Sequence, residues 1–161
     1  MILTSFVRKP RDLLDDFELN FWSVPFIDTD FSRLFTQTYA LFMGLGRWNL
    51  VFNSQFRRAA LKNRWVPVTT AETLSYRKSI KAFASVRLRT RLLCWDEKRF
   101  YLEQTFFIGD QVHAQAFVQG LIRGPNGHLR PTEFFQALGV ENKSPEFPPH
   151  IRAWISSMNG T

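Results

Sequence analysis

Cysteine is almost absent from this sequence of 161 residues, in which Cys94 is the only one. A single cysteine excludes an intrachain disulfide and a zinc site built from several thiolates. It is typical of a protein in a reducing compartment, so we expect a cytoplasmic location. The three histidines, His113, His128 and His150, lack the spacing of a metal site, and no metal is expected.

Long uninterrupted apolar runs are also lacking. The longest, residues 34–52, is interrupted by Gly44, Gly46, Arg47 and Asn49, and it falls short of the ~20 apolar residues that a membrane-spanning helix needs. The N-terminal segment has no continuous apolar core of the kind found in signal peptides. We therefore expect no membrane span and no cleaved leader.

Several catalytic signatures are missing. The sequence contains no phosphate-binding glycine loop, no metal-binding signature and no Gly-x-Ser-x-Gly elbow. These absences exclude P-loop kinases, zinc hydrolases and serine hydrolases of the usual kinds. No cofactor is expected.

Positive charge and aromatic side chains are abundant. The net charge is +7, and the chain contains 17 Phe and 5 Trp. A basic balance favours a nucleic acid, an anionic membrane or a phosphate-bearing small molecule as partner. The aromatic residues lie on apolar faces rather than among the arginines, so nucleic-acid binding ranks last and we expect no nucleic-acid partner. Many rings indicate a core of large side chains or a cavity lined by them.

Hydrophobic periodicity predicts an α+β domain. The apolar run of residues 34–52 has apolar residues on almost every side of a helical wheel, which predicts a buried helix. Alternation and turn residues predict five strands, at residues 17–24, 65–76, 86–94, 99–108 and 112–120. The expected fold is a curved antiparallel sheet of about five strands in succession, wrapped around one long central helix. We expect a single domain, residues 1–161, with its core at about 18–124 and short helical segments between 131 and 158.

The hairpin after residue 94 predicts a register. Centring it on Glu97 places Arg91 opposite Glu103, with an ion pair between them on the outer face. Cys94 is then expected on the apolar inner side. For the next hairpin we expect a three-residue loop, Gly109–Gln111, because it keeps residues 112, 114, 116 and 118 on the same side as Phe106. Arg87, Arg89 and Arg91 together are interpreted as a solvated sheet face, with a phosphate clamp as the alternative.

Two carboxylates, Asp28 and Asp30, precede the predicted helix. The helix dipole favours negative charge at this end. The functional interpretation is a catalytic carboxylate beside free backbone N–H groups, and the alternative is capping of the loop and the helix. For Asp28 a structural role is favoured.

These stretches together resemble a known family. The Asp28-Thr29-Asp30 loop leading into a helix, followed by residues 72–80, 88–96 and 99–104 on an antiparallel sheet, is similar to the hot-dog-fold acyl-CoA thioesterases of the 4-hydroxybenzoyl-CoA thioesterase type. The resemblance covers roughly residues 18–124. It implies that the protein hydrolyses an acyl-CoA thioester, with coenzyme A as part of the substrate. It also implies a homodimer or higher homo-oligomer with the site between subunits.

The resemblance assigns roles to individual residues. Asp30 aligns with the family's catalytic carboxylate, a nucleophile or the base that activates water. Four residues at the start of the helix would contact the substrate: Thr36, Gln37, Thr38 and Tyr39. Their backbone N–H groups would form the oxyanion site, whereas the alternative is that they are ordinary helix-start polar residues. The family's His and Asn pair are replaced here, which leaves open a second interpretation, a non-catalytic protein that binds acyl-CoA or a lipid-like ligand.

Overall fold

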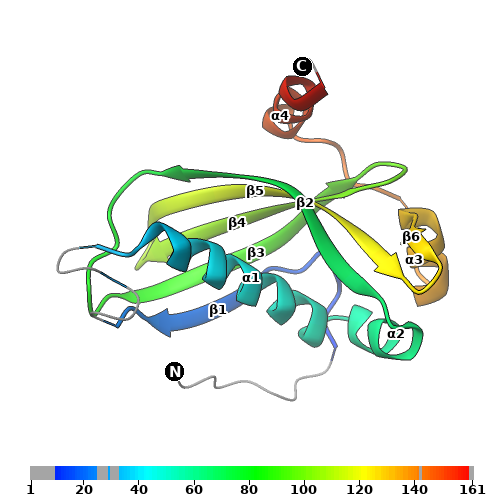
Figure 1. Cartoon of the computed structure of the whole chain (residues 1–161), viewed down its shortest axis with the longest axis horizontal. Coiled ribbons are helices and arrows are strands. Elements are labelled where there is room, and N and C mark those ends of the chain that lie inside the picture. Colours follow the sequence, from blue (N-terminus) through cyan, green and yellow to red (C-terminus); the bar gives the residue numbers. More distant parts are fainter. Residues whose placement is uncertain (1–9, 25–28, 30–32, 142, 160–161) are drawn as a thin grey trace.

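The computed structural model describes residues 10–24, 29, 33–141 and 143–159, which form a six-stranded sheet and four helices (Figure 1). The elements follow the chain in this order: β1 Phe17–Trp22, α1 Thr36–Asn53, α2 Phe56–Asn63, β2 Val66–Tyr76, β3 Ser85–Trp95, β4 Phe100–Ile108, β5 Gln111–Gly124, β6 Gly127–Leu129, α3 Pro131–Leu138 and α4 Pro149–Asn159. The α+β class and the antiparallel sheet are confirmed. The small strand β6 was not predicted.

The order of the strands differs from the expected succession. The sheet runs β1-β3-β4-β5-β2, so β2 pairs with β5 and not with β3. Residues 77–84, which connect β2 to β3, therefore cross the end of the sheet past β5 and β4. We call this segment the crossover. Ile80 in this crossover is fully buried, and its carbonyl accepts a hydrogen bond from the Leu34 amide at 2.8 Å. The crossover therefore closes the end of the sheet at which α1 begins.

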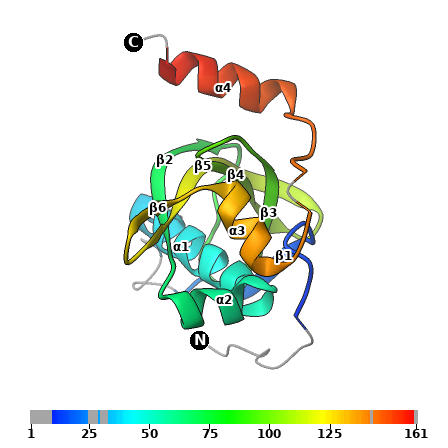
Figure 2. The same cartoon turned by 90° about the vertical axis from the view of Figure 1, so that its right-hand side faces the viewer.

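Helix α1 lies against the inner face of the sheet, which curves around it in the end-on view (Figure 2). Gly46 permits the close approach, because a Cβ atom there would lie 2.7 Å from Thr90 Oγ1 and 2.8 Å from Gln104 Nε2. The buried amide of Gln104 donates to the Met43 carbonyl and to Thr90 Oγ1, both at 2.9 Å. This contact attaches the middle of the helix to the centre of the sheet.

The prediction of one long central helix is not confirmed, because four helices form in the described part of the chain. Helix α1 is the longest at 18 residues. The chain breaks after it at Ser54, whose hydroxyl accepts the Phe56 amide at 3.2 Å and so starts α2. The backbone of Arg11 forms hydrogen bonds with the residues on both sides of this break. Its amide donates to the Asn53 carbonyl, and its carbonyl accepts from the Gln55 amide.

The prediction that α1 is buried on all sides is wrong. Its inner face is buried, but the outward side exposes Leu41 by 61%, Trp48 by 42% and Phe52 by 38%. With the half-buried Leu45, these residues recur at intervals of four, three and four, which places them on one stripe of the helix surface. We call Leu41, Leu45, Trp48 and Phe52 the outer stripe of α1.

Helix α4 lies on the opposite face of the sheet from α1 (Figures 1 and 2). Its Ile151 is fully buried together with Cys94 and Tyr101. The expected position of Cys94 on the inner side is therefore wrong. A bulge between Leu92 and Cys94 shifts the register of β3 against β4, and the shift turns the thiol to the face that α4 covers.

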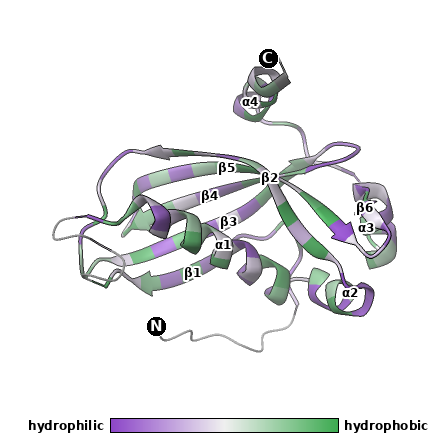
Figure 3. Ribbon diagram, in the orientation of Figure 1, coloured by the Kyte–Doolittle hydropathy of each residue, from purple (hydrophilic) through white to green (hydrophobic). Residues whose placement is uncertain are grey.

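The second hairpin reaches the expected alignment by a different route. Its loop has two residues, Gly109 and Asp110, because Ile108 pairs with Gln111. A bulge between Phe106 and Phe107 then restores the alignment, so that Phe106 pairs with Ala114. Residues 114, 116 and 118 are consequently buried on the inner face as predicted, whereas Val112 is not on that face. Figure 3 shows the resulting alternation of hydrophobic and hydrophilic residues along the strands.

The register of β3 and β4 is confirmed, but the ion pair is not. Arg91 does lie opposite Glu103. Its guanidinium instead forms a two-pronged pair with Asp16, at 2.6 and 2.7 Å. Glu103 lies 3.8 Å from Arg89. The arginines of β3 form ion pairs with carboxylates on neighbouring segments. This face is therefore a network of ion pairs, and the interpretation as a phosphate-binding site is not supported.

The two glycines of α1 should respond oppositely to alanine. A Cβ at Gly44 meets no atom within 4 Å, so Gly44→Ala should raise the free energy of unfolding by about 1 kcal/mol through helix propensity. Gly46→Ala should lower it by roughly 1–3 kcal/mol, because the methyl overlaps Thr90 and Gln104. Urea unfolding of both variants checks this. Equal effects of the two substitutions would contradict the close packing at Gly46.

Candidate active site

A cavity of about 330 Å³ lies at the start of α1. It forms where the first turn of α1, the end of β2 and the crossover come together. Its lining consists of Arg33, Leu34, Thr36, Tyr39, Tyr76, Arg77, Lys78 and Ser79. We call it the head pocket. Of the residues expected to contact substrate, Thr36 and Tyr39 line it, whereas Gln37 is exposed and Thr38 is buried outside its lining. Asp28 and Asp30 lie outside the described residues.

Among the residues that the structure describes, no side chain caps the N-terminus of α1. The capping position is Phe35, which offers no side-chain hydrogen bond. The amide of Thr38 donates to the Phe35 carbonyl at 3.0 Å. The amides of Thr36 and Gln37 have no acceptor within the helix, as at every helix start. This end of the helix is therefore a source of hydrogen-bond donors and of positive potential beside the head pocket.

Three basic side chains line the head pocket: Arg33, Arg77 and Lys78. None of the described lining residues is acidic. The Arg77 guanidinium donates to Gln115 Oε1 at 3.3 Å, which holds it at the edge of the sheet. Together with the helix terminus, these cations would stabilise a negative charge that develops on a bound molecule.

Tyr39 forms the inner wall of the head pocket. Its ring is buried and makes edge contacts with Tyr76 and Phe106, at centroid distances of 5.0 and 5.1 Å. Burial raises the pKa of its phenol, and Tyr76 raises it further, while a hydrogen bond with the Ile80 backbone acts against both. The phenol is therefore protonated at neutral pH.

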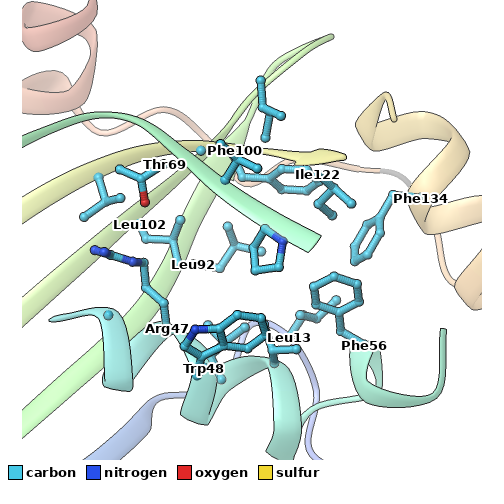
Figure 4. Close-up of a pocket in the computed structure, with 18 residues that line it drawn as sticks. Leu13, Arg47, Trp48, Phe56, Thr69, Leu92, Phe100, Leu102, Ile122 and Phe134 are labelled. Atoms are coloured by element: carbon cyan, nitrogen blue, oxygen red, sulfur yellow. The ribbon is translucent and has the colours of Figure 1, made fainter. Parts of the chain in front are cut away.

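A second cavity, of about 200 Å³, lies further along α1. Figure 4 shows Arg47 and Thr69 at one end and Phe56 and Phe134 at the other. We call it the tail pocket. Its wall consists mainly of aliphatic and aromatic side chains of α1, β2, β4 and β5, closed by one residue each from α2 and α3. Both pockets are lined by α1 and β2, so they lie along the same side of the domain.

Arg47 is the cationic residue of the tail pocket, and it already has partners. Its guanidinium donates to Gln104 Oε1 at 3.0 Å and lies 3.4 Å from Glu72. Burial lowers the pKa of this guanidinium, and Glu72 opposes the shift. The charge of Arg47 faces Gln104 and Glu72 and not the interior of the pocket. Glu72 is thus the ion-pair partner of Arg47. The remaining lining is mostly apolar.

The described residues contain no cluster of three or more His, Cys, Asp or Glu that could hold a metal ion. Within the same residues, none of the helices has both the length and the hydropathy needed to cross a membrane.

Comparison with known proteins places this geometry in a family. A model of the Thioesterase-like superfamily matches residues 24–155, which is most of the chain. The chain belongs to this superfamily. The match covers every lining residue of the head pocket and all of those of the tail pocket except Leu13. It does not distinguish the 4-hydroxybenzoyl-CoA type, which stays a prediction.

Curated relatives match over about half of the chain. Protein THEM6 of Xenopus laevis is 35% identical over 86 residues, which are 52% of this chain and 40% of that protein. Protein THEM6 of Danio rerio is 34% identical over 91 residues, 55% of this chain and 43% of that protein. The matched part of this chain thus spans less than half the length of these relatives.

Solved structures share the hot-dog fold. The probable thioesterase YbaW from Escherichia coli superposes with a TM-score of 0.68 at 17% identity, over 76% of this chain and 96% of that one. The protein SAV2348 from Staphylococcus aureus, solved in complex with CoA, superposes with a TM-score of 0.61 at 13% identity, over 92% and 87% of the two chains. At these identities the likeness shows the fold alone.

Sequence reasoning missed the basic side of the head pocket. No role was predicted for Arg77 and Lys78, because the strand order that brings the crossover to the start of α1 was not apparent. The adjacent basic pair directly after the predicted strand at residues 65–76 was the available signal. Tyr76 was likewise treated only as a strand residue.

The lone thiol should be inert in the folded protein. Cys94 is fully buried, and burial, with a contribution from Asp96, raises its pKa to about 12. Since the thiolate is the reactive form, a thiol reagent at mildly alkaline pH should label the native protein only as fast as it unfolds, and label it at once in denaturant. Labelling of native protein at the rate of a free thiol would contradict this placement.

Proposed function

We propose that the protein hydrolyses an acyl-CoA thioester, with Asp30 as nucleophile or general base and the start of α1 as the oxyanion site. The observation that carries the proposal is the head pocket: a helix N-terminus, capped by no described side chain, beside a cavity with basic walls. Asp30 precedes Arg33 by three residues, a reach of about 10 Å of extended chain. Membership of the thioesterase-like superfamily, and the complex of the similar SAV2348 with CoA, support a CoA thioester as substrate.

The chemistry follows from the charge that develops during attack. Addition to the thioester carbonyl carbon moves an electron pair onto its oxygen. The amides of Thr36 and Gln37 would donate hydrogen bonds to that oxygen, and Arg77 and Lys78 would add positive potential. Either Asp30 attacks directly and water hydrolyses the resulting anhydride, or Asp30 takes a proton from the attacking water. In both cases the C–S bond breaks, and the products are a carboxylic acid and the CoA thiol.

The two carboxylates before α1 provide a matched test. Asp30→Asn should reduce kcat for acyl-CoA hydrolysis by at least about 100-fold, because the amide is neither a nucleophile nor a base. Asp28→Asn should retain most of the activity. Thiol release from a panel of acyl-CoA substrates measures both, and circular dichroism checks the fold. Turnover by the Asp30 variant equal to the wild type would reject the assignment.

The same panel addresses the second interpretation, a non-catalytic binder of acyl-CoA or of a lipid-like ligand. The replacement of the family's His and Asn pair by residues 34–38 motivates it. Saturable binding of acyl-CoA without turnover at any chain length would favour the binder.

The proposed assembly is a homodimer. Strand β2 is an edge of the sheet, with exposed Val66 and Val68, and the outer stripe of α1 exposes apolar surface. Unpaired edges and apolar stripes are surfaces that association covers. Two copies related by a two-fold axis would cover both at once. A cytoplasmic location remains a prediction.

Two exposed leucines on neighbouring helices test the dimer. Leu41→Glu places a charge in the outer stripe and should convert the dimer to a monomer, because burying an unpaired carboxylate is costly. Leu61→Glu, on α2 and outside the stripe, should leave the mass unchanged; Leu61 is 69% exposed. Light scattering after size exclusion measures both. A monomeric wild-type protein would refute the assembly, and a dimeric Leu41 variant would refute this interface.

A further inference from the structure

We propose that the tail pocket binds the apolar tail of the acyl group, and that Phe134 sets the longest tail that fits. The assignment to a thioester substrate rests on the proposed function, whereas the binding of an apolar chain does not. The tail would pass Arg47 and end against the ring of Phe134.

The exposure of the lining residues shows which end is open. In a single copy of the chain, Trp48, Val68 and Thr69 are exposed and form the mouth, which would lie at the rim of the proposed dimer interface. Phe56, Phe100 and Phe134 are buried, the last with only 1% exposure, and they form the far end. A molecule can therefore enter from the side of Arg47 and Thr69, where Figure 4 shows these two side chains.

The far end is a rigid aromatic wall. The ring of Phe134 meets Phe56 edge-to-face at a centroid distance of 5.0 Å and meets Phe100 at 5.4 Å. Three rings from α2, α3 and β4 hold one another in place, and edge-to-face pairs of this kind add stability beyond their buried area. Such a wall limits length, because a longer chain has to displace packed rings.

The chemistry of the lining favours an uncharged chain. Arg47 is engaged by Gln104 and Glu72, so it does not present a free cation to the interior. At about 200 Å³ the pocket exceeds the roughly 150 Å³ apolar cavity known to bind benzene. Ligand pockets are typically apolar with a few polar groups at the rim. An aliphatic or aryl tail with its polar end outside the mouth fits this arrangement.

The tail pocket lies within reach of a molecule bound in the head pocket. Gly44 in the tail pocket follows Thr36 in the head pocket by eight residues, which is about 12 Å along the helix axis. A thioester held at the start of α1 can therefore extend its tail along the helix towards Arg47. The Arg47–Glu72 pair joins α1 to β2 at the mouth of the tail pocket.

Binding of free fatty acids tests the inference without requiring catalysis. Saturated fatty acids of increasing length compete with the fluorescent probe cis-parinaric acid for the intact protein. In the wild type, affinity should rise about fourfold for each added methylene until the chain reaches Phe134, and then stop rising. In Phe134→Ala the rise should continue to longer chains.

Two further variants separate an effect on the pocket from a general effect on folding. Phe135→Ala removes the neighbouring buried ring of α3, which packs on Trp95 and contacts Phe134 at a centroid distance of 5.1 Å but does not line the pocket. It should keep the wild-type length limit, because the ring of Phe134 still closes the far end. Gly44→Leu adds a side chain inside the pocket from a position where a Cβ meets no atom, and it should weaken binding of long chains at least tenfold.

The outcomes separate this inference from the proposed function. A length limit that moves in Phe134→Ala, and not in Phe135→Ala, supports the tail pocket even if no acyl-CoA is hydrolysed. An identical limit in the wild type and Phe134→Ala, or unchanged binding in Gly44→Leu, overturns it even if hydrolysis is found. Absence of fatty-acid binding by the wild type also overturns it.

Discussion

The contact between Gly46 and Gln104 decides where α1 lies, and the rest of the domain depends on that position. The missing side chain at Gly46 lets the helix backbone approach the sheet, and the buried Gln104 amide uses both its donor and its acceptor there. A buried amide without these partners would cost stability, so the contact admits few alternative positions of the helix. It also holds Arg47 at the mouth of the tail pocket, which connects the packing of the core with the geometry of the site.

The pairing of β2 with β5 is the second constraint. It sends residues 77–84 across the end of the sheet, and that crossover supplies Arg77 and Lys78 to the start of α1. It also places β2 beside α1 along the edge of the domain. The head pocket and the tail pocket thus share two walls, the helix and the edge strand. The arrangement suits a molecule with a polar reactive head and an apolar tail, which is the character of an acyl thioester.

The parts predicted well were those governed by neighbours in sequence. Alternation along β3 and β4, with a hairpin centred on Glu97, predicted the pairing of Arg91 with Glu103. A helical segment beginning near residue 131 was likewise predicted, and α3 has Pro131 at its start and Gly139 in the left-handed region at its end. Bulges were not predicted, because one extra residue leaves no mark on hydrophobic alternation. Two predictions were therefore wrong, the face of Cys94 and the length of the Gly109 loop.

The sequence by itself determined the class of the domain, most of its strands, the helix that follows Asp30 and the resemblance to thioesterases. These features rest on periodicity, turn chemistry and short motifs, which act over a few residues. Only the tertiary structure decided that β2 pairs with β5, that Asp16 takes Arg91 from Glu103, and that Phe134 closes a pocket begun by α1. Such choices depend on which distant surfaces can be buried together, and that is a property of the whole packed chain rather than of any segment.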